Sequence, residues 1–170
     1  MLKVMIVDAE AERAEVLHQA LARAGYEVVA YVPSTFDLHR QVSALQPDIV
    51  IIDTDSPDRD TLENICVVSR DEPRPVVMFT HDGDSEKIRA ATLAGVSAYV
   101  VDGMTGERIR PIIDAAATAT WVKGVLAGET PVPLPLVNQL ACCLFGSGYT
   151  NDMNQAKAIV AVETGSLAAA

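Results

Sequence analysis

Short apolar runs alternate with helical patterns along the first two-thirds of the chain. Five of these runs predict strands, at residues 2–8, 27–32, 48–53, 75–80 and 98–102. Most are nearly continuous in Val and Ile rather than alternating, which is typical of strands covered on both faces of a parallel sheet. The pattern therefore predicts a parallel sheet buried between two layers of helices.

Apolar residues at helical spacing predict one helix after each strand. The first ends at Gly25, and the second is entered through Ser34 and Asp37, a pair that resembles a capping box. The remaining three are expected over residues 60–70, over 85–95 and from about 107 onward. Pro111 is tolerable in the last of them only within the first turn, where no intrahelical N–H bond is lost.

The strand–helix alternation predicts an α/β fold with a doubly wound, five-stranded parallel sheet and five helices. Right-handed crossovers and the strand order 2-1-3-4-5 place the switch point between the first and third strands. Ligands in such sheets bind beyond the carboxyl ends of the strands at that point. Asp8 ends the first run and Asp53 ends the third, so we expect both carboxylates in one crevice.

The charge balance narrows the possible partners. The net charge is -10 and the pI about 4.6, which argues against an exposed nucleic-acid surface. The sequence contains no run of about 20 apolar residues, so no membrane span is expected. The apolar stretch before Asp8 is too short for a signal peptide. We therefore expect a cytoplasmic protein. Three cysteines show no metal-ligand spacing, and Cys66 is expected to be buried in the third helix.

The acidic crevice has a specific chemical capacity. Asp8 and Asp53 supply the hard carboxylate oxygens that Mg²⁺ prefers, and the main-chain carbonyl of Asp55 adds a third ligand. A carboxylate beside a cation can attack a phosphoryl donor and form an aspartyl phosphate. The crevice is therefore a candidate site for cation binding and phosphoryl transfer.

Four motifs resemble those of a response-regulator receiver domain (CheY-like). They are residues 4–8 (Val-Met-Ile-Val-Asp), 49–53 (Ile-Val-Ile-Ile-Asp) followed by Pro57, 77–80 (Val-Met-Phe-Thr) and 94–101 (Ala-Gly-Val-Ser-Ala-Tyr-Val-Val). Their order and spacing match the family over residues 1–117. Residues 53–61 and 69–80 further resemble the NasT/AmiR-type antitermination regulators of nitrogen metabolism. The resemblance implies a two-component phosphorelay switch, a bacterial source and no enzyme activity.

The resemblance also implies a role for each matching residue. Asp53 matches the phosphoacceptor, Asp8 an acidic Mg²⁺ ligand and Asp55 the residue that ligates through its main chain. Thr80 matches the switch hydroxyl, and Tyr99 the aromatic switch. The implied partner is a sensor histidine kinase or a sensor/inhibitor protein. A homodimer through the face of the fourth helix, fifth strand and fifth helix is also implied.

Two positions depart from the family pattern. Receivers usually carry a second acid after the first, where this chain has Ala9, so weak Mg²⁺ binding is expected. Glu10 is a poorly placed substitute at a helix start. Receivers also carry a Lys at the end of the fifth strand, where this chain has Asp102. An anion facing the pocket there would oppose a dianionic phosphoryl group. Among the histidines, His81 lies nearest the crevice.

Residues 118–170 differ in character from the rest of the chain. They hold five charged residues, against 31 in residues 1–117. They show neither the charged helical linker nor the ANTAR RNA-binding module of the antitermination regulators. We expect an irregular C-terminal extension of unknown fold, and RNA binding is not supported.

Three functions are compatible with these observations. The first is a receiver switched by phosphorylation of Asp53. The second is a pseudo-receiver, in which the same fold docks a sensor partner without phosphorylation; Ala9 and Asp102 favour it. The third starts from Asp53-Thr54-Asp55, which fits the D-x-D motif of haloacid-dehalogenase-type phosphatases. That family carries its motif near the start of the chain, and no suitable Lys follows the fourth strand, so the third function is disfavoured.

Overall fold

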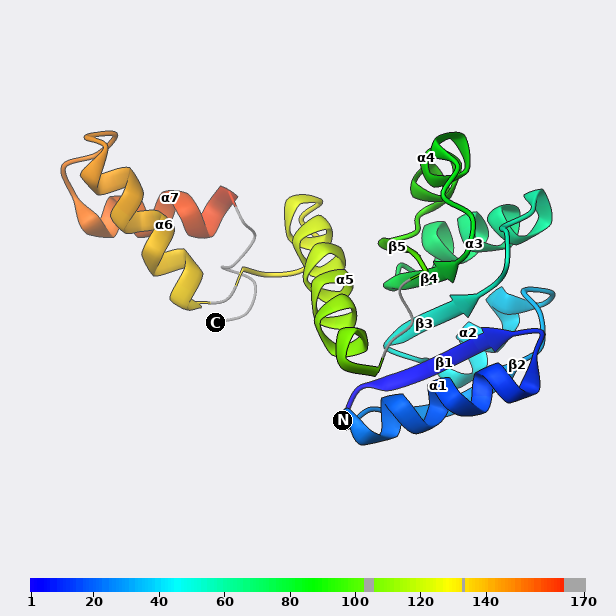
Figure 1. The fold of residues 1–170 in the computed structure, drawn as a ribbon. Coiled ribbons are helices and arrows are strands. Elements are labelled where there is room, and N and C mark those ends of the chain that lie inside the picture. The colour runs from blue at the N-terminus through cyan, green and yellow to red at the C-terminus, as the bar shows by residue number, and fades with distance from the viewer. Residues whose placement is uncertain (103–105, 133, 164–170) are drawn as a thin grey trace. The chain divides into compact units, whose positions relative to one another are not determined.

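A five-stranded parallel sheet forms the centre of the first 120 residues (Figure 1). The computed structural model describes residues 1–102, 106–132 and 134–163. The strands run in the order β2-β1-β3-β4-β5, as the sequence predicted. Their bounds are Lys3–Asp8 (β1), Glu27–Val32 (β2), Ile49–Asp53 (β3), Val76–Thr80 (β4) and Ala98–Val101 (β5).

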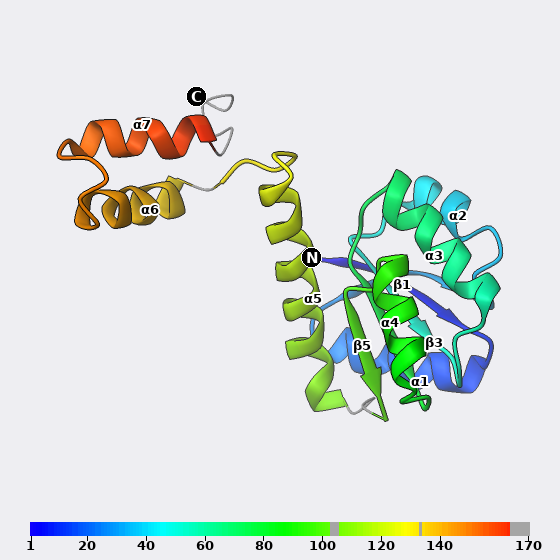
Figure 2. The ribbon, with the colours of Figure 1, turned by 90° about the horizontal axis from the view of Figure 1, so that it is seen from above.

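Five helices cover the two faces of this sheet (Figure 2). Their bounds are Ala11–Arg23 (α1), Leu38–Leu45 (α2), Arg59–Asp71 (α3), Ser85–Ala94 (α4) and Gly106–Leu126 (α5). Successive side chains of a strand point to opposite faces, and they divide the core into two clusters. Met5 and Val7 of β1 pack toward α2, α3 and α4, whereas Val4 and Ile6 pack toward α1 and α5. The predicted α/β fold is confirmed.

The register of β1 and β3 aligns their last residues. Val4 pairs with Ile49, and the ladder continues residue by residue to Asp8 and Asp53. Both strands are buried almost throughout, so a slip of one residue would turn every apolar side chain to the wrong face. The packing of the core therefore also fixes the position of the two carboxylates.

Three local expectations were wrong. Asp37 is itself the N-cap of α2, with a left-handed backbone, while the Ser34 hydroxyl accepts from the amide of Phe36. Pro111 lies inside α5 beyond its first turn, on the exposed side of the helix. Cys66 is exposed, because α3 turns Ile65 and Val68 toward the sheet instead.

The C-terminal extension is helical, which corrects the expectation of an irregular tail. Residues Trp121–Ala170 form a second compact unit that contains the end of α5, α6 (Leu134–Gly146) and α7 (Met153–Glu163). Its core includes Val137 and Ala141 of α6 and Ala156 and Val160 of α7. In each helix the two residues are four positions apart, so they lie on the same face of the helix.

A search for membrane-spanning segments gives a negative result for the described parts of the chain. None of the helices there combines the length and the apolar character that a bilayer crossing requires.

Gly95 ends α4 with a φ of +107° and lies directly against the side chain of Ser69 on α3. A Cβ at this position would overlap the Ser69 hydroxyl and would also strain the left-handed backbone. We predict that Gly95→Ala lowers the free energy of unfolding by about 2–4 kcal/mol, measured by urea denaturation.

Gly25 provides the matched control for this substitution. It follows α1 with a φ of +89°, but an added Cβ would meet nothing within 4 Å. Gly25→Ala should therefore show the backbone strain alone, about 1 kcal/mol. Equal losses in the two variants would contradict the predicted contact with Ser69.

Candidate functional site

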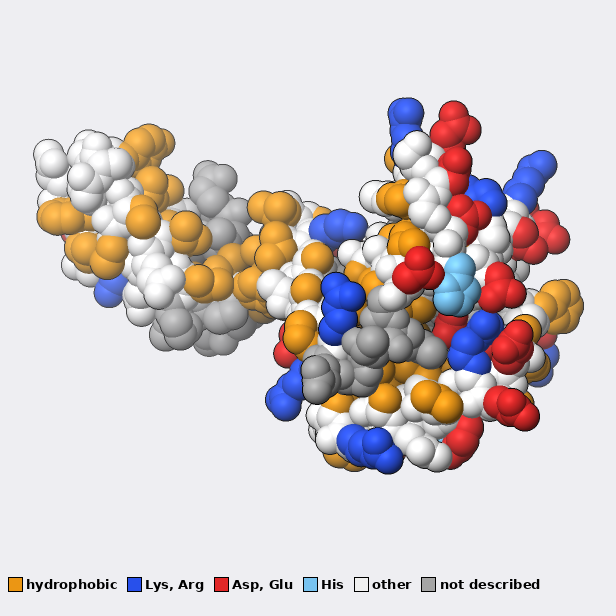
Figure 3. Space-filling model, viewed as in Figure 1, with side chains coloured by type: hydrophobic (Ala, Val, Ile, Leu, Met, Phe, Trp, Pro, Cys, Tyr) orange, Lys and Arg blue, Asp and Glu red, His pale blue; other side chains and the backbone are white. Residues whose placement is uncertain are grey.

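The two predicted carboxylates lie side by side at the carboxyl edge of the sheet. Asp8 and Asp53 are register partners at the ends of β1 and β3, and both are buried, with exposed fractions of 1% and 7%. A hollow of about 300 Å³ opens beside them, lined also by the β2–α2 loop and by α3. Figure 3 shows Asp and Glu side chains gathered along this edge. The predicted acidic crevice is present.

A basic residue that the sequence reasoning missed lies among these acids. Arg13, in the first turns of α1, donates to Asp8 from Nη2 at 2.8 Å and from Nε at 2.9 Å. Its Nε also lies 3.4 Å from Asp53 Oδ2, and its Nη1 lies 3.2 Å from Asp55 Oδ1. Glu10 contributes a longer ion pair at 3.8 Å. One guanidinium therefore touches all three predicted site aspartates.

Burial dominates the ionisation of Asp53. Desolvation raises the pKa of its carboxyl to about 6, and the nearby Asp8 and Asp55 charges act in the same direction. The Arg13 charge opposes them and lowers the Asp53 pKa. Hydrogen bonding to Asp8 in turn raises the pKa of Arg13, which keeps the guanidinium charged. Near pH 7.5 the Asp53 carboxyl is therefore mostly ionised, and it lies beside a permanently charged guanidinium.

Thr80 connects the two loops that border the crevice. It ends β4, is 3% exposed, and donates its hydroxyl proton to the main-chain carbonyl of Asp55 at 2.8 Å. The same oxygen accepts from the amide of Asp82 at 3.1 Å. The hydroxyl thus ties the β3–α3 loop to the β4–α4 loop, and it engages the carbonyl that was expected to bind metal.

Tyr99 lies on β5 and is partly buried against α4. Its hydroxyl donates to the main-chain carbonyl of Asp82 at 2.8 Å. The Asp82 carboxylate pairs with Lys87 at 2.6 Å, and both groups contact the Ser56 hydroxyl. These bonds lower the pKa of Asp82 to about 2. Tyr99 therefore reaches the same β4–α4 loop as Thr80, from the α4 side.

Asp102 does not stand unpaired beside the acids. Its carboxylate lies 2.6 Å from Nδ1 of His81, and both side chains are largely exposed. The Asp102 backbone is left-handed, with a φ of +48°. The bond to Asp102 raises the pKa of His81, and the imidazolium lowers the pKa of Asp53. The pair thus brings a titratable cation to the end of the sheet where a receiver usually has Lys.

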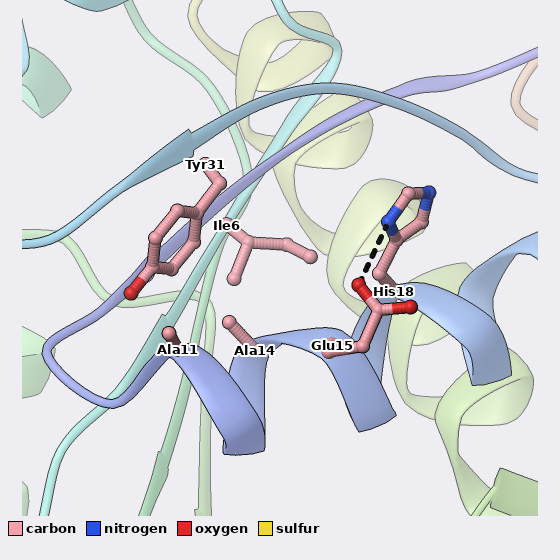
Figure 4. Close-up of a pocket in the computed structure, with 6 residues that line it drawn as sticks. All are labelled: Ile6, Ala11, Ala14, Glu15, His18 and Tyr31. Atoms are coloured by element: carbon pink, nitrogen blue, oxygen red, sulfur yellow. Dashed lines mark ion pairs between the residues drawn. The ribbon is translucent and has the colours of Figure 1, made fainter.

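A second hollow lies between α1 and β2 (Figure 4). It measures about 250 Å³ and is lined by Ile6, Ala11, Ala14, Glu15, His18 and Tyr31. Glu15 and His18 form an ion pair with each other at 3.9 Å, and most of the remaining wall is apolar. We therefore take the acidic crevice at the ends of β1 and β3, and not this hollow, as the candidate site.

Comparison with known proteins identifies the family. A model described as the response regulator receiver domain matches residues 4–114, and the chain belongs to this family. The match favours the receiver interpretation of Asp53-Thr54-Asp55 over the phosphatase interpretation. Domains of this family serve two-component signalling, bind Mg²⁺ in an acidic pocket and interact with sensor kinases; the domain itself is not an enzyme.

Relatives of known identity cover the same part of the chain. Chemotaxis protein CheY of Listeria monocytogenes is 25% identical over 118 residues, or 69% of this chain and 99% of the relative. Transcriptional regulatory protein PdtaR of Mycobacterium tuberculosis is 26% identical over 127 residues, or 75% of this chain and 62% of PdtaR. The solved structure of chemotaxis protein CheY4 of Vibrio cholerae superposes with a TM-score of 0.60 at 21% identity. That superposition covers 68% of this chain and 98% of CheY4, and it bears on the fold alone.

The pocket as it lies does not fit the family's metal ion. Both oxygens of Asp8 and one of Asp53 face nitrogens of Arg13, and the Asp55 carbonyl accepts from Thr80. The position of the usual second acid is Ala9. Within the described ranges there is no group of three or more His, Cys, Asp or Glu side chains that could hold a metal. The oxygens that Mg²⁺ would need are engaged by the chain itself.

Asp53 gives a pH-dependent test of this geometry. A carboxyl whose pKa is raised in the folded state binds its proton more tightly when folded, so ionisation costs stability as the pH rises from about 4 to about 6. The full cost, about 2–3 kcal/mol, remains above that range. We predict that Asp53→Asn raises the free energy of unfolding by about 2 kcal/mol near pH 7.5, and that the gain disappears near pH 4.

The measurement is urea denaturation of both proteins at the two pH values. Glu12→Gln is the control, because Glu12 is an exposed acid on α1. It should show no comparable gain at the higher pH. A pH-independent effect of Asp53→Asn would contradict the burial of an ionisable carboxyl at the end of β3.

Proposed function

We propose that residues 1–117 act as a receiver domain switched by phosphorylation of Asp53. One observation supports this most strongly. The Asp53 carboxyl lies at the end of β3 beside a hollow, with its Oδ2 3.4 Å from the Arg13 guanidinium. A nucleophilic carboxylate and a fixed positive charge are the two elements that phosphoryl transfer to an acid requires.

A small phosphodonor can supply the phosphoryl group to Asp53 directly. An ionised oxygen of Asp53 attacks the phosphorus, the bond from phosphorus to the donor's leaving group breaks, and that group departs with the electron pair. Asp53 becomes an acyl phosphate. With a pKa of about 6, most of the carboxyl is ionised near pH 7.5 and available as the nucleophile. Arg13 offsets part of the charge that the phosphoryl group brings into the pocket.

The proposed response passes through Thr80 and Tyr99 to the face formed by α4, β5 and α5. Both hydroxyls bond to the β4–α4 loop, so a change at either residue alters how that loop is held. Two of the elements that form this face carry exposed apolar residues: Leu93 of α4 is 77% exposed, and Val101 of β5 is 38% exposed. Exposed apolar side chains of this kind suit a second copy of the chain or a sensor histidine kinase.

The direct test is incubation of the full chain with acetyl phosphate, followed by mass spectrometry. We predict one added phosphoryl group, located at Asp53, and none at that position in Asp53→Asn, which lacks the nucleophile. The incubation is run with and without Mg²⁺. Absence of labelling under both conditions, while a known receiver is labelled in parallel, would refute phosphorylation of Asp53.

Self-association through the α4–β5–α5 face gives a further prediction. If phosphodonor treatment drives dimerisation there, Leu93→Asp should abolish it, because a charge would replace an apolar contact. Val16→Asp is the matched control, since Val16 is an apolar residue of α1 that is 64% exposed. Light scattering after size exclusion measures both. Equal dimerisation of the two variants would exclude this face.

The second candidate is a docking module that a sensor partner controls without phosphorylation. The occupation of the acidic pocket by Arg13 favours it, as does the replacement of the usual acid and lysine by Ala9 and Asp102. Binding of a sensor partner to Asp53→Ala with unchanged affinity would support docking. Loss of binding in that variant would favour the phosphorylation switch.

The process that this protein regulates is predicted only from the resemblance of its sequence. The resemblance to NasT/AmiR-type regulators favours nitrogen metabolism, with a sensor/inhibitor protein as the partner. Residues 118–170 hold only five charged residues, a composition that does not favour RNA binding by this extension.

A further inference from the structure

The oxygens of the acidic pocket are already bound to a cation that belongs to the chain. The Arg13 side chain is 19% exposed, whereas the side chains of Asp8 and Asp53 are 0% and 6% exposed. Nε and Nη2 approach the two oxygens of Asp8 at 2.9 and 2.8 Å, in the paired geometry that a planar guanidinium forms with a carboxylate. This is the best-satisfied ion pair of the site.

A divalent ion would need the same oxygens. Mg²⁺ binds carboxylate oxygens at about 2.0–2.1 Å in a near-octahedral shell. At Asp8 and at Oδ2 of Asp53 those positions face Arg13 nitrogens. A divalent ion bound at this distance would lie close to the Arg13 guanidinium, and repulsion between the two cations would favour displacement of Arg13 from a fully buried carboxylate. The chain also lacks the second acid that would compensate for this loss, since Ala9 occupies its position.

The place of Arg13 in the fold explains why its side chain reaches this pocket. α1 begins at Ala11, directly after the turn that follows β1, so its first turn stands over the end of that strand. The amide of Glu10 also donates to Asp8 Oδ1 at 2.8 Å, which holds this turn against the carboxylate. Arg13 is therefore carried to the pocket by the same turn that orients Asp8.

We propose that Arg13 is the resident cation of this pocket and that it excludes the divalent ion that receiver domains generally bind. The positive charge at the strand ends thus belongs to a side chain of the protein and not to a bound metal ion. A second consequence rests on the proposed function: a phosphoryl group on Asp53 would be met by the guanidinium, and acceptance of the phosphoryl group would not depend on Mg²⁺.

The decisive experiment titrates the unphosphorylated full chain with Mn²⁺, observed by electron paramagnetic resonance, and with Mg²⁺ by calorimetry. We expect no saturable site in the wild type up to about 10 mM. Arg13→Ala and Arg13→Gln should gain a site, with a dissociation constant at least about tenfold below that limit. Arg23→Ala, which removes an exposed arginine from the last turn of the same helix, should behave as the wild type.

A second pair of variants restores the family's acid. Ala9→Asp should bind Mn²⁺ more weakly than Ala9→Asp/Arg13→Ala, because Arg13 still competes in the first variant only. Circular dichroism and urea denaturation confirm that each variant is folded. Equal Mn²⁺ affinity in wild type and Arg13→Ala, together with equal affinity in the Ala9→Asp pair, would overturn the proposal.

A phosphodonor experiment separates this inference from the proposed function. Labelling of Asp53 by acetyl phosphate at the same rate in EDTA and in Mg²⁺ would support Arg13 as the cation, and a strict requirement for Mg²⁺ would overturn it. A wild type that accepts no phosphoryl group under either condition counts against Asp53 as the acceptor. The metal titrations then still decide the role of Arg13, because they use the unphosphorylated protein.

Discussion

Burying two neighbouring carboxylates in their ionised form is costly unless an opposite charge lies beside them. In this chain the parallel register of β1 and β3 places Asp8 and Asp53 side by side, and the core on both faces of the sheet prevents any other alignment. Arg13 supplies the opposite charge from the next element of the chain. The site is therefore a by-product of how the sheet must pack, completed by one residue of α1.

The fold and the positions of the acids could be predicted because both follow from local sequence. Continuous Val and Ile runs define buried parallel strands, and the residue that ends each run lies at the carboxyl edge. Arg13 was not predicted because its role depends on where a flexible side chain is directed. The signal available was one basic residue in an acidic stretch that also contains Asp8, Glu10, Glu12 and Glu15. The helices of the extension were not predicted, because its few charged residues leave little contrast between polar and apolar positions along α6 and α7.

Each departure from the family pattern is accompanied by a second charged or titratable residue near the same position. The loss of an acid at Ala9 accompanies a cation at Arg13, and the anion at Asp102 accompanies His81. Taken alone, Asp102 suggested that the electrostatics of the pocket were reversed. Its carboxylate instead contacts the imidazole of His81 and raises the pKa of that imidazole, so Asp102 does not face the pocket as an unpaired anion.

The Thr80 hydroxyl can donate to only one of the acceptors around the crevice at full strength. A hydroxyl has a single proton to give, and here that proton goes to the carbonyl of Asp55. Any new acceptor near the end of β4 could be served only by withdrawing it from that carbonyl. The β3–α3 loop and the rival acceptor would thus compete for one hydrogen atom, so a gain for one of them weakens the other.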